Sequence, residues 1–249
     1  MNNILLENET LTKVNENINL IQNKNGLTFG TDAFLLASFI KQQKNSIAVE
    51  LGGGTGIISL LCASREKFKT IYCAEIQESF ANIIDRNAKL NYLDGKVISL
   101  CSDIRELKSA SIGCEVDAVF SNPPYMKTDS GKRNEFDEKY IARHEVCGDI
   151  SDFCACAKRL LKHGGFFYCV WRPDRLVDLV CAMRENSLEP KEICFVHANT
   201  KSEPSIVLIK AKKGASSGSI ICKPLFLNED DNSKMLTERA KKIYEECNF

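Results

Sequence analysis

The sequence lacks an excess of charge, a long apolar run and a cysteine pair of the CxxC type. Its 33 basic residues balance 33 acidic ones, so charge alone gives no reason to expect a nucleic-acid partner. The apolar runs are short and interrupted, so no membrane-spanning helix is expected. The N-terminus has no basic start followed by an apolar core, so it does not resemble a secretory signal. These absences predict a cytoplasmic protein.

The 12 cysteines are scattered rather than grouped. The closest pair, Cys154 and Cys156, has one residue between them, and side chains at that spacing do not face each other on a helix. Cys73, Cys101 and Cys169 lie inside apolar runs, where cysteine behaves as a small hydrophobic residue. We therefore expect reduced, buried thiols and no metal site.

Apolar, strand-like runs alternate with helical segments through most of the chain. The expected strands are 46–51, 69–75, 96–103, 115–122, 166–171, 192–198 and 204–212, and the expected helices among them are 55–66, 79–91, 150–165 and 173–186. Strands that alternate with helices of about 10–15 residues predict a mostly parallel sheet with helices on both faces. Only residues 199–203 join the last two strands, too few for a crossover, so these strands form an antiparallel pair.

The expected fold is therefore α/β, with a seven-stranded, mostly parallel sheet that has one antiparallel strand at one end. Residues 1–45 form an N-terminal extension with a helix near 31–42. Residues 46–213 form the core, and residues 214–249 form a C-terminal tail with a helix near 234–246. The sequence shows no second domain and no internal repeat.

A glycine loop follows the first expected strand, with glycines at positions 52, 53, 54 and 56. Glycine permits positive φ and lets a ligand approach the backbone. The spacing Gly52, Gly54, Gly56 is neither the dinucleotide fingerprint nor a Walker loop. Glu50 precedes the loop, where it would repel a pyrophosphate but attract the ammonium and sulfonium of S-adenosyl-L-methionine. The loop therefore indicates that cofactor, whose product after methyl transfer is S-adenosyl-L-homocysteine.

Acidic residues end three successive strands: Glu50, Glu75 and Asp103. Ligands of open α/β sheets bind at the carboxyl ends of the strands. Glu75 can accept both hydroxyls of a ribose, and Asp103 lies within reach of an adenine amino group. Each residue alone is more often a solvated strand end, but the series is more specific. We also place the following residues, Ile76 and Ile104, at the cofactor.

The motif Asn-Pro-Pro-Tyr occupies residues 122–125, after the fourth expected strand. An amino nitrogen conjugated to a ring or a carbonyl is a poor nucleophile, because its lone pair is delocalised. The side-chain oxygen of Asn122 and the carbonyl of Pro123 can accept its two hydrogens and favour a pyramidal nitrogen in the transition state. Pro123 and Pro124 lock φ, so the carbonyl is held outward, and Tyr125 offers a ring for stacking. These four residues are the expected catalytic residues, and Asn122 is also expected to contact the cofactor.

The glycine loop and this motif together resemble the Rossmann-like class I methyltransferases that modify planar amino nitrogens. Further segments resemble the bacterial methyltransferases that make N6-methyladenine beside the anticodon of valine tRNA: 26–39, 142–145, 172–176 and 202–214. This similarity runs over roughly residues 15–227. It implies N6-methylation of the adenine just 3′ of the anticodon, with Thr31 and Asp32 near the methionine end of the cofactor and their helix covering the site. Glu50 departs from the family, where an aspartate is usual.

The resemblance implies a tRNA partner for an expected monomer, with the basic loop 127–143 as the candidate contact. Its basic residues are Lys127, Lys132, Arg133, Lys139 and Arg143, which would equally suit an ordinary solvated loop. One alternative is a glutamine methyltransferase of release factors, which usually has a helical domain ahead of the loop; only 48 residues precede Val49 here. N6-methylation of another RNA and a non-catalytic binding protein are further alternatives. Trp171 is expected either to line the target pocket or to end a core strand.

Overall fold

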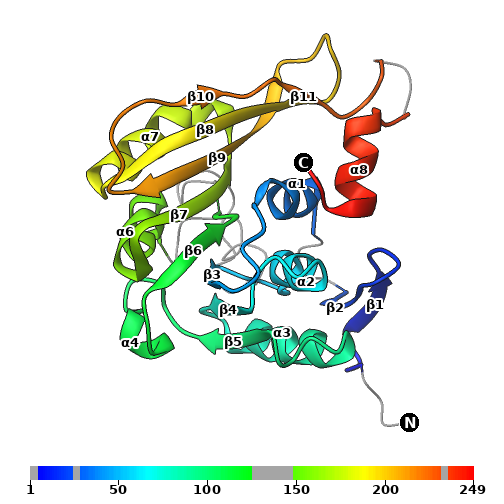
Figure 1. The fold of residues 1–249 in the computed structure, drawn as a ribbon. Helices are drawn as coiled ribbons and strands as arrows, with labels where there is room; N and C mark the ends of the chain where they lie inside the picture. Colours follow the sequence, from blue (N-terminus) through cyan, green and yellow to red (C-terminus); the bar gives the residue numbers. More distant parts are fainter. Residues whose placement is uncertain (1–4, 25–28, 125–147, 231–234) are drawn as a thin grey trace, which may run out of the picture.

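A large mixed sheet runs through the molecule (Figure 1). The computed structural model describes residues 5–24, 29–124, 148–230 and 235–249. The seven longer strands of the sheet are β3 (Ile47–Leu51), β4 (Thr70–Glu75), β5 (Val97–Cys101), β6 (Val116–Ser121), β7 (Leu161–Trp171), β8 (Leu188–His197) and β9 (Pro204–Lys213). Their spatial order is β8-β9-β7-β6-β3-β4-β5. Strands β3 to β7 pair in parallel, and β9 is antiparallel to both of its neighbours.

The prediction of a mostly parallel α/β sheet with one antiparallel strand is confirmed. The antiparallel strand β9 is not the outermost one, since it is inserted between β7 and β8. Two short strands, β10 (Ile220–Ile221) and β11 (Leu225–Phe226), also pair in parallel with the outer edge of β8. They bring the sheet to nine strands.

Helices cover both faces of this sheet, as the alternating pattern predicted. On one face lie α1 (Thr31–Phe39), α2 (Ile57–Ser64) and α3 (Glu78–Leu90). On the other lie α4 (Ser109–Ile112), α6 (Ile150–Leu160) and α7 (Leu176–Glu185), which follows the 3₁₀ turn η2 (Pro173–Arg175). Each layer has its own hydrophobic cluster against the sheet. Burial on both faces explains why the central strands are almost continuously apolar.

Helix α6 ends earlier than the sequence predicted. Its start is well defined, because Asp149 caps it by accepting hydrogen bonds from the N–H groups of Ser151 (2.8 Å) and Asp152 (3.1 Å). The helix was expected to reach the glycine pair at 164–165, but it ends at Leu160 and β7 begins at once. The glycines instead lie inside an irregularity where β7 shifts register against β6.

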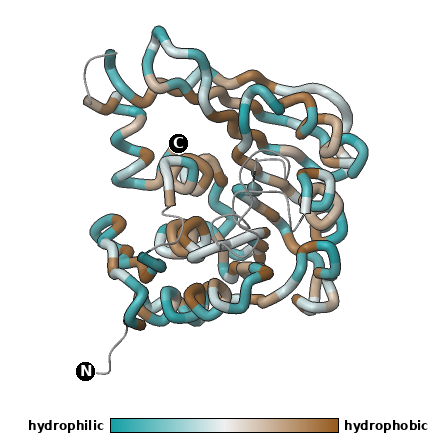
Figure 2. Tube along the Cα trace, turned by 180° about the vertical axis from the view of Figure 1, so that it is seen from behind, coloured by the Kyte–Doolittle hydropathy of each residue, from teal (hydrophilic) through white to brown (hydrophobic). Residues whose placement is uncertain are grey.

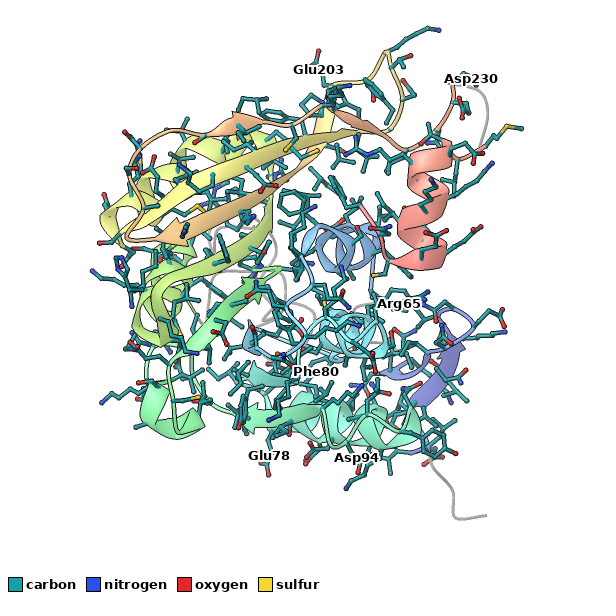
Figure 3. All side chains as sticks on the ribbon, in the orientation of Figure 1. Arg65, Glu78, Phe80, Asp94, Glu203 and Asp230 are labelled. Atoms are coloured by element: carbon teal, nitrogen blue, oxygen red, sulfur yellow. The ribbon has the colours of Figure 1, made fainter. Side chains whose placement is uncertain are left out.

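The C-terminal tail packs into the core. Its helix α8 (Glu238–Glu246) lies on α1, with ring centroids of Phe34 and Tyr244 5.3 Å apart. Arg65, at the end of α2, donates a hydrogen bond of 2.5 Å to the carbonyl of Glu245 (Figure 3). Figure 2 colours much of α8 teal, in keeping with its many charged residues. Ile243 is buried in the same hydrophobic cluster as α1 and α2.

The N-terminal residues form a separate two-stranded hairpin, β1 (Glu9–Lys13) and β2 (Asn19–Asn23), which packs on α3. Cysteines 73, 154, 156 and 169 are buried and free, as expected. Cys101, Cys114 and Cys181 are exposed, which corrects the prediction of buried thiols; Cys101 ends the edge strand β5. Within the described ranges, no helix is long and apolar enough to cross a membrane.

Candidate functional site

The register of the parallel strands brings the predicted site residues to one edge of the sheet. Leu51, the last residue of β3, pairs with Ala74 on one side and with Ser121 on the other. Glu75 ends β4 and pairs with Cys101 of β5. The segments that leave these strands therefore start side by side: the glycine loop, the segment after Glu75, and Asn122.

The glycine loop turns sharply between β3 and α2. Gly52, Gly54 and Gly56 have φ values of +70°, +54° and +80°, a region that side-chain-bearing residues rarely adopt. The N–H groups of Gly52 and Gly53 both donate to the carbonyl of Ala74, at 2.9 and 3.0 Å. The three glycines singled out in the sequence are thus the ones whose backbone requires glycine.

Gly53 is needed for a different reason, which the sequence did not reveal. A Cβ atom at this position would lie 2.1 Å from the sulfur of Cys73 and 3.4 Å from Cδ1 of Ile84. The loop therefore packs its backbone directly on β4. This contact between Gly53 and Cys73, which are 20 positions apart, is visible only in the folded chain.

Glu75 lies beneath the loop with its carboxylate held by two backbone groups. Its Oε2 accepts a hydrogen bond from the N–H of Gly54 at 2.9 Å, and its Oε1 accepts one from Gln77 at 3.0 Å. Burial raises the pKa of Glu75, and these two hydrogen bonds oppose the rise. Each carboxylate oxygen has a further lone pair, so the group can still accept hydrogen bonds from a ligand.

Glu50 lies deeper than the sequence predicted. Its side chain is 1% exposed, and one carboxylate oxygen accepts hydrogen bonds from the Ser59 N–H (3.0 Å), the Ser59 hydroxyl and the Cys73 thiol (3.4 Å). Burial raises the pKa of Glu50 to about 7, although these hydrogen bonds lower it. The structure thus places Glu50 against α2 below the loop, and its contact with the cofactor stays a prediction.

Asp103 follows β5 and is paired with a residue that the sequence analysis did not include. Its carboxylate accepts hydrogen bonds from the backbone N–H of Arg105 at 2.9 Å and from the Arg105 guanidinium at 2.5–3.0 Å. This pairing lowers the pKa of Asp103. Ile104, the next residue, is buried, and Ile76 is half-buried on the neighbouring segment.

Asn122 carries an unsatisfied polar atom. Its Oδ1 is buried and accepts no hydrogen bond from any residue that the structure describes. A buried acceptor without a partner is costly, so such atoms commonly mark a place where a ligand donates. Pro123 is buried and Pro124 half-buried beside it, whereas Tyr125 lies outside the described residues. The basic residues of loop 127–143 also lie outside them.

Three other residues named in the sequence analysis lie on α1 and at the end of β7. Thr31 and Asp32 are half-buried in the first turn of α1, and their approach to the cofactor stays a prediction. Trp171 ends a core strand: it is buried, its Nε1–H donates to the carbonyl of Arg175 at 2.9 Å, and that arginine lies over its ring. No cluster of three or more metal-ligating side chains occurs among the residues described.

The sequence of the chain matches the model of a known family over more than half of its length. The methyltransferase small domain family matches residues 21–177. The chain belongs to this family. It is therefore a methyltransferase.

Two relatives among the curated proteins carry the same name. A tRNA1(Val) (adenine(37)-N6)-methyltransferase of Phocaeicola vulgatus is 28% identical over 187 residues, which cover 74% of this chain and 76% of the relative. One from Bacteroides fragilis is 24% identical over 222 residues, covering 89% and 87%.

Solved structures share the fold. A predicted O-methyltransferase from Agrobacterium tumefaciens superimposes with a TM-score of 0.70 at 21% identity, covering 86% of this chain and 95% of that one. The TYW2 protein of M. jannaschii, crystallised with AdoMet, gives a TM-score of 0.57 at 17% identity, covering 83% and 86%. These likenesses support the class I Rossmann-like methyltransferase fold.

Proposed function

We propose that this methyltransferase transfers a methyl group from S-adenosyl-L-methionine to N6 of an adenine in tRNA. The proposed target is adenine 37 of a valine tRNA, the substrate named for both curated relatives. The observation that carries the proposal is the buried Oδ1 of Asn122 at the carboxyl edge of the sheet, which has no hydrogen-bond partner among the described residues. An exocyclic amino group of a base could donate the hydrogen bond that this oxygen lacks.

The residues at the edge suit the cofactor. The glycine loop exposes its backbone to a ligand, since Gly52 is exposed and bears no side chain. Glu75 would accept the ribose hydroxyls, and Asp103 with Ile76 and Ile104 would hold the adenine end. Thr31 and Asp32 would lie at the methionine end. When bound, the cofactor supplies an electrophilic methyl group on a sulfonium.

Glu50 would act on this site through the loop. Its carboxylate holds the first turn of α2 from below by accepting from Ser59, so it would support the loop. The longer side chain of glutamate, compared with aspartate, spans the gap to α2.

Asn122 and Pro123 would be the main catalytic residues. Their oxygens would accept the two hydrogens of the target amino group, which favours a pyramidal nitrogen with a localised lone pair. Pro123 and Pro124 fix the backbone so that the carbonyl direction does not vary. No strong general base is required, because the proton leaves after the nitrogen has become cationic. Tyr125, beyond the described residues, would stack on the base.

The test is methyl transfer from radiolabelled S-adenosyl-L-methionine to separate pools of bulk tRNA, ribosomal RNA and total protein. We expect label in tRNA, recovered as N6-methyladenosine after nucleoside digestion. A valine tRNA transcript with guanosine in place of adenine 37 should take no label. Label in protein, as N5-methylglutamine, would instead support a glutamine methyltransferase, and label in ribosomal RNA would show that another RNA is the substrate.

A further inference from the structure

One buried side chain connects the N-terminal hairpin with the glycine loop. Asn87 of α3 is 0% exposed. Its Oδ1 accepts a hydrogen bond from the N–H of Ile21 at 2.7 Å, and its Nδ2 donates to the carbonyls of Ile21 at 3.0 Å and Thr55 at 2.9 Å. Ile21 belongs to β2 and Thr55 to the glycine loop, so a single amide joins three segments distant in sequence.

Asn91, the residue directly after α3, repeats only the hairpin half of this arrangement, and its Nδ2 also donates to the carbonyl of Asn87 at 2.7 Å. The Oδ1 of Asn91 accepts from the N–H of Asn19 at 2.8 Å, and its Nδ2 donates to the carbonyl of Asn19 at 2.7 Å. Residues four apart on a helix are separated by about 6 Å, close to the roughly 6.7 Å between alternate residues of a strand. The two asparagines therefore bind β2 much as a neighbouring strand would.

The glycine loop needs such a partner. Thr55 lies between Gly54 and Gly56, both at positive φ, and peptides flanked by glycine have little conformational preference of their own. Asn87 fixes the direction of the Thr55 carbonyl through a buried hydrogen bond. The other end of this turn is closed by the Gly56 N–H, which donates to the carbonyl of Gly53 at 2.8 Å.

The hairpin is anchored to the same helix by charge as well. The two terminal guanidinium nitrogens of Arg86 each donate to one carboxylate oxygen of Glu9 in β1, both at 2.6 Å. The Glu9 side chain is almost fully buried by this contact. Bidentate pairs of this kind fix orientation as well as distance. The hairpin and α3 therefore hold one defined arrangement, which presents Ile21 to Asn87.

We propose that Asn87 is a positioning residue that couples docking of the hairpin to the shape of the cofactor loop. The hairpin would then influence the cofactor site indirectly, through the contacts that Asn87 of α3 makes with Ile21 and Thr55. The proposal rests on the function proposed above, in which this loop binds S-adenosyl-L-methionine.

The test compares Asn87→Ala with Asn91→Ala. Both variants lose the side-chain amide that binds the hairpin, but only Asn87 also bonds the loop. We expect Asn87→Ala to weaken binding of S-adenosyl-L-methionine roughly tenfold by calorimetry, the factor that corresponds to one buried hydrogen bond. Asn91→Ala should keep the affinity within about twofold while its melting temperature falls. An affinity of Asn87→Ala within about twofold of that of the unaltered protein would overturn the proposal.

A second measurement needs no variant and covers the case in which Asn87→Ala does not fold. Coupling is reciprocal, so a ligand on the loop must also stabilise the hairpin. Saturating S-adenosyl-L-homocysteine should slow hydrogen exchange of the Ile21 amide in the unaltered protein. An unchanged exchange rate refutes the coupling. Calorimetry on the unaltered protein tests the proposed function separately. If that protein binds neither S-adenosyl-L-methionine nor S-adenosyl-L-homocysteine, the proposed function fails as well.

Discussion

The hydroxyl of Ser121 donates a hydrogen bond of 2.7 Å to the backbone carbonyl of Leu51. Both residues are buried, and they are the last residues of the adjacent parallel strands β6 and β3. The next residues in the chain are Asn122 and Gly52. The separation between the proposed acceptor and the cofactor loop is therefore set by two paired strands and not by mobile loops, which suits a site that must hold two reactants in line.

Asn122→Ala should lower the rate of methyl transfer by about 100-fold or more, because one positioned group is worth on the order of 3 kcal/mol in the transition state. Binding of S-adenosyl-L-methionine, measured by calorimetry, should survive at least in part. Asn122→Asp is the matched control, since it keeps an acceptor oxygen and should lose less activity. Normal turnover in the alanine variant would remove Asn122 from the mechanism.

Glu75→Ala should weaken cofactor binding, because it removes the proposed acceptor for the ribose hydroxyls and leaves the N–H of Gly54 without its partner. We expect a loss of roughly tenfold or more in affinity. Glu78→Ala provides the control, since Glu78 is an exposed carboxylate three positions further along (Figure 3). If both variants bind the cofactor as the unaltered protein does, the ribose assignment is wrong.

Glu50 should make the protein less stable as the pH rises. Its pKa is raised from 4.5 to about 7 in the folded state, so the folded chain binds the proton more tightly than the unfolded chain. The stability it contributes is fully present below its ordinary pKa and is lost as the pH rises through about 7. The whole change amounts to on the order of 3 kcal/mol.

Glu50→Gln tests this prediction, because glutamine keeps an acceptor for Ser59 but does not titrate. Urea unfolding between about pH 5 and about pH 8 should show a flatter pH dependence in the variant. The raised pKa of Glu75 also makes the protein less stable as the pH rises. Because Glu75 is present in both proteins, its effect cancels in the comparison. Parallel curves for the two proteins would show that Glu50 keeps an ordinary pKa.

Gly53→Ala should destabilise the fold by roughly 1–3 kcal/mol through overpacking, because the added Cβ would lie 2.1 Å from the sulfur of Cys73. Cys73→Ala removes that sulfur, so the double variant should recover part of the loss in a double-mutant cycle. Gly95→Ala is the control, since nothing lies within 4 Å of a Cβ there. If the effects of the two substitutions on stability are simply additive, Gly53 is required for a reason other than its contact with Cys73.

Much of the fold followed from local patterns. The alternation of strands and helices predicted the parallel sheet, and the short 199–203 connection predicted the antiparallel strand. The boundary between α6 and β7 was missed, because the glycines at 164–165 look like a helix stop until their place beside β6 is known. The sequence did not identify Arg105 as the partner of Asp103, because many other pairings of these side chains were equally compatible with the sequence.

The sequence alone determined the α/β class, the glycine loop and the Asn-Pro-Pro motif after the fourth long strand, because these depend on residue types at short spacing. Only the tertiary structure distinguished the roles of Glu50 and Glu75, which look equivalent in the sequence. Glu50 pairs with Cys73, two residues before Glu75 along β4, so its carboxylate accepts from Ser59 of α2, whereas the Glu75 carboxylate accepts from the N–H groups of Gly54 and Gln77. The difference is one of strand register, which is decided by contacts between segments far apart in the chain.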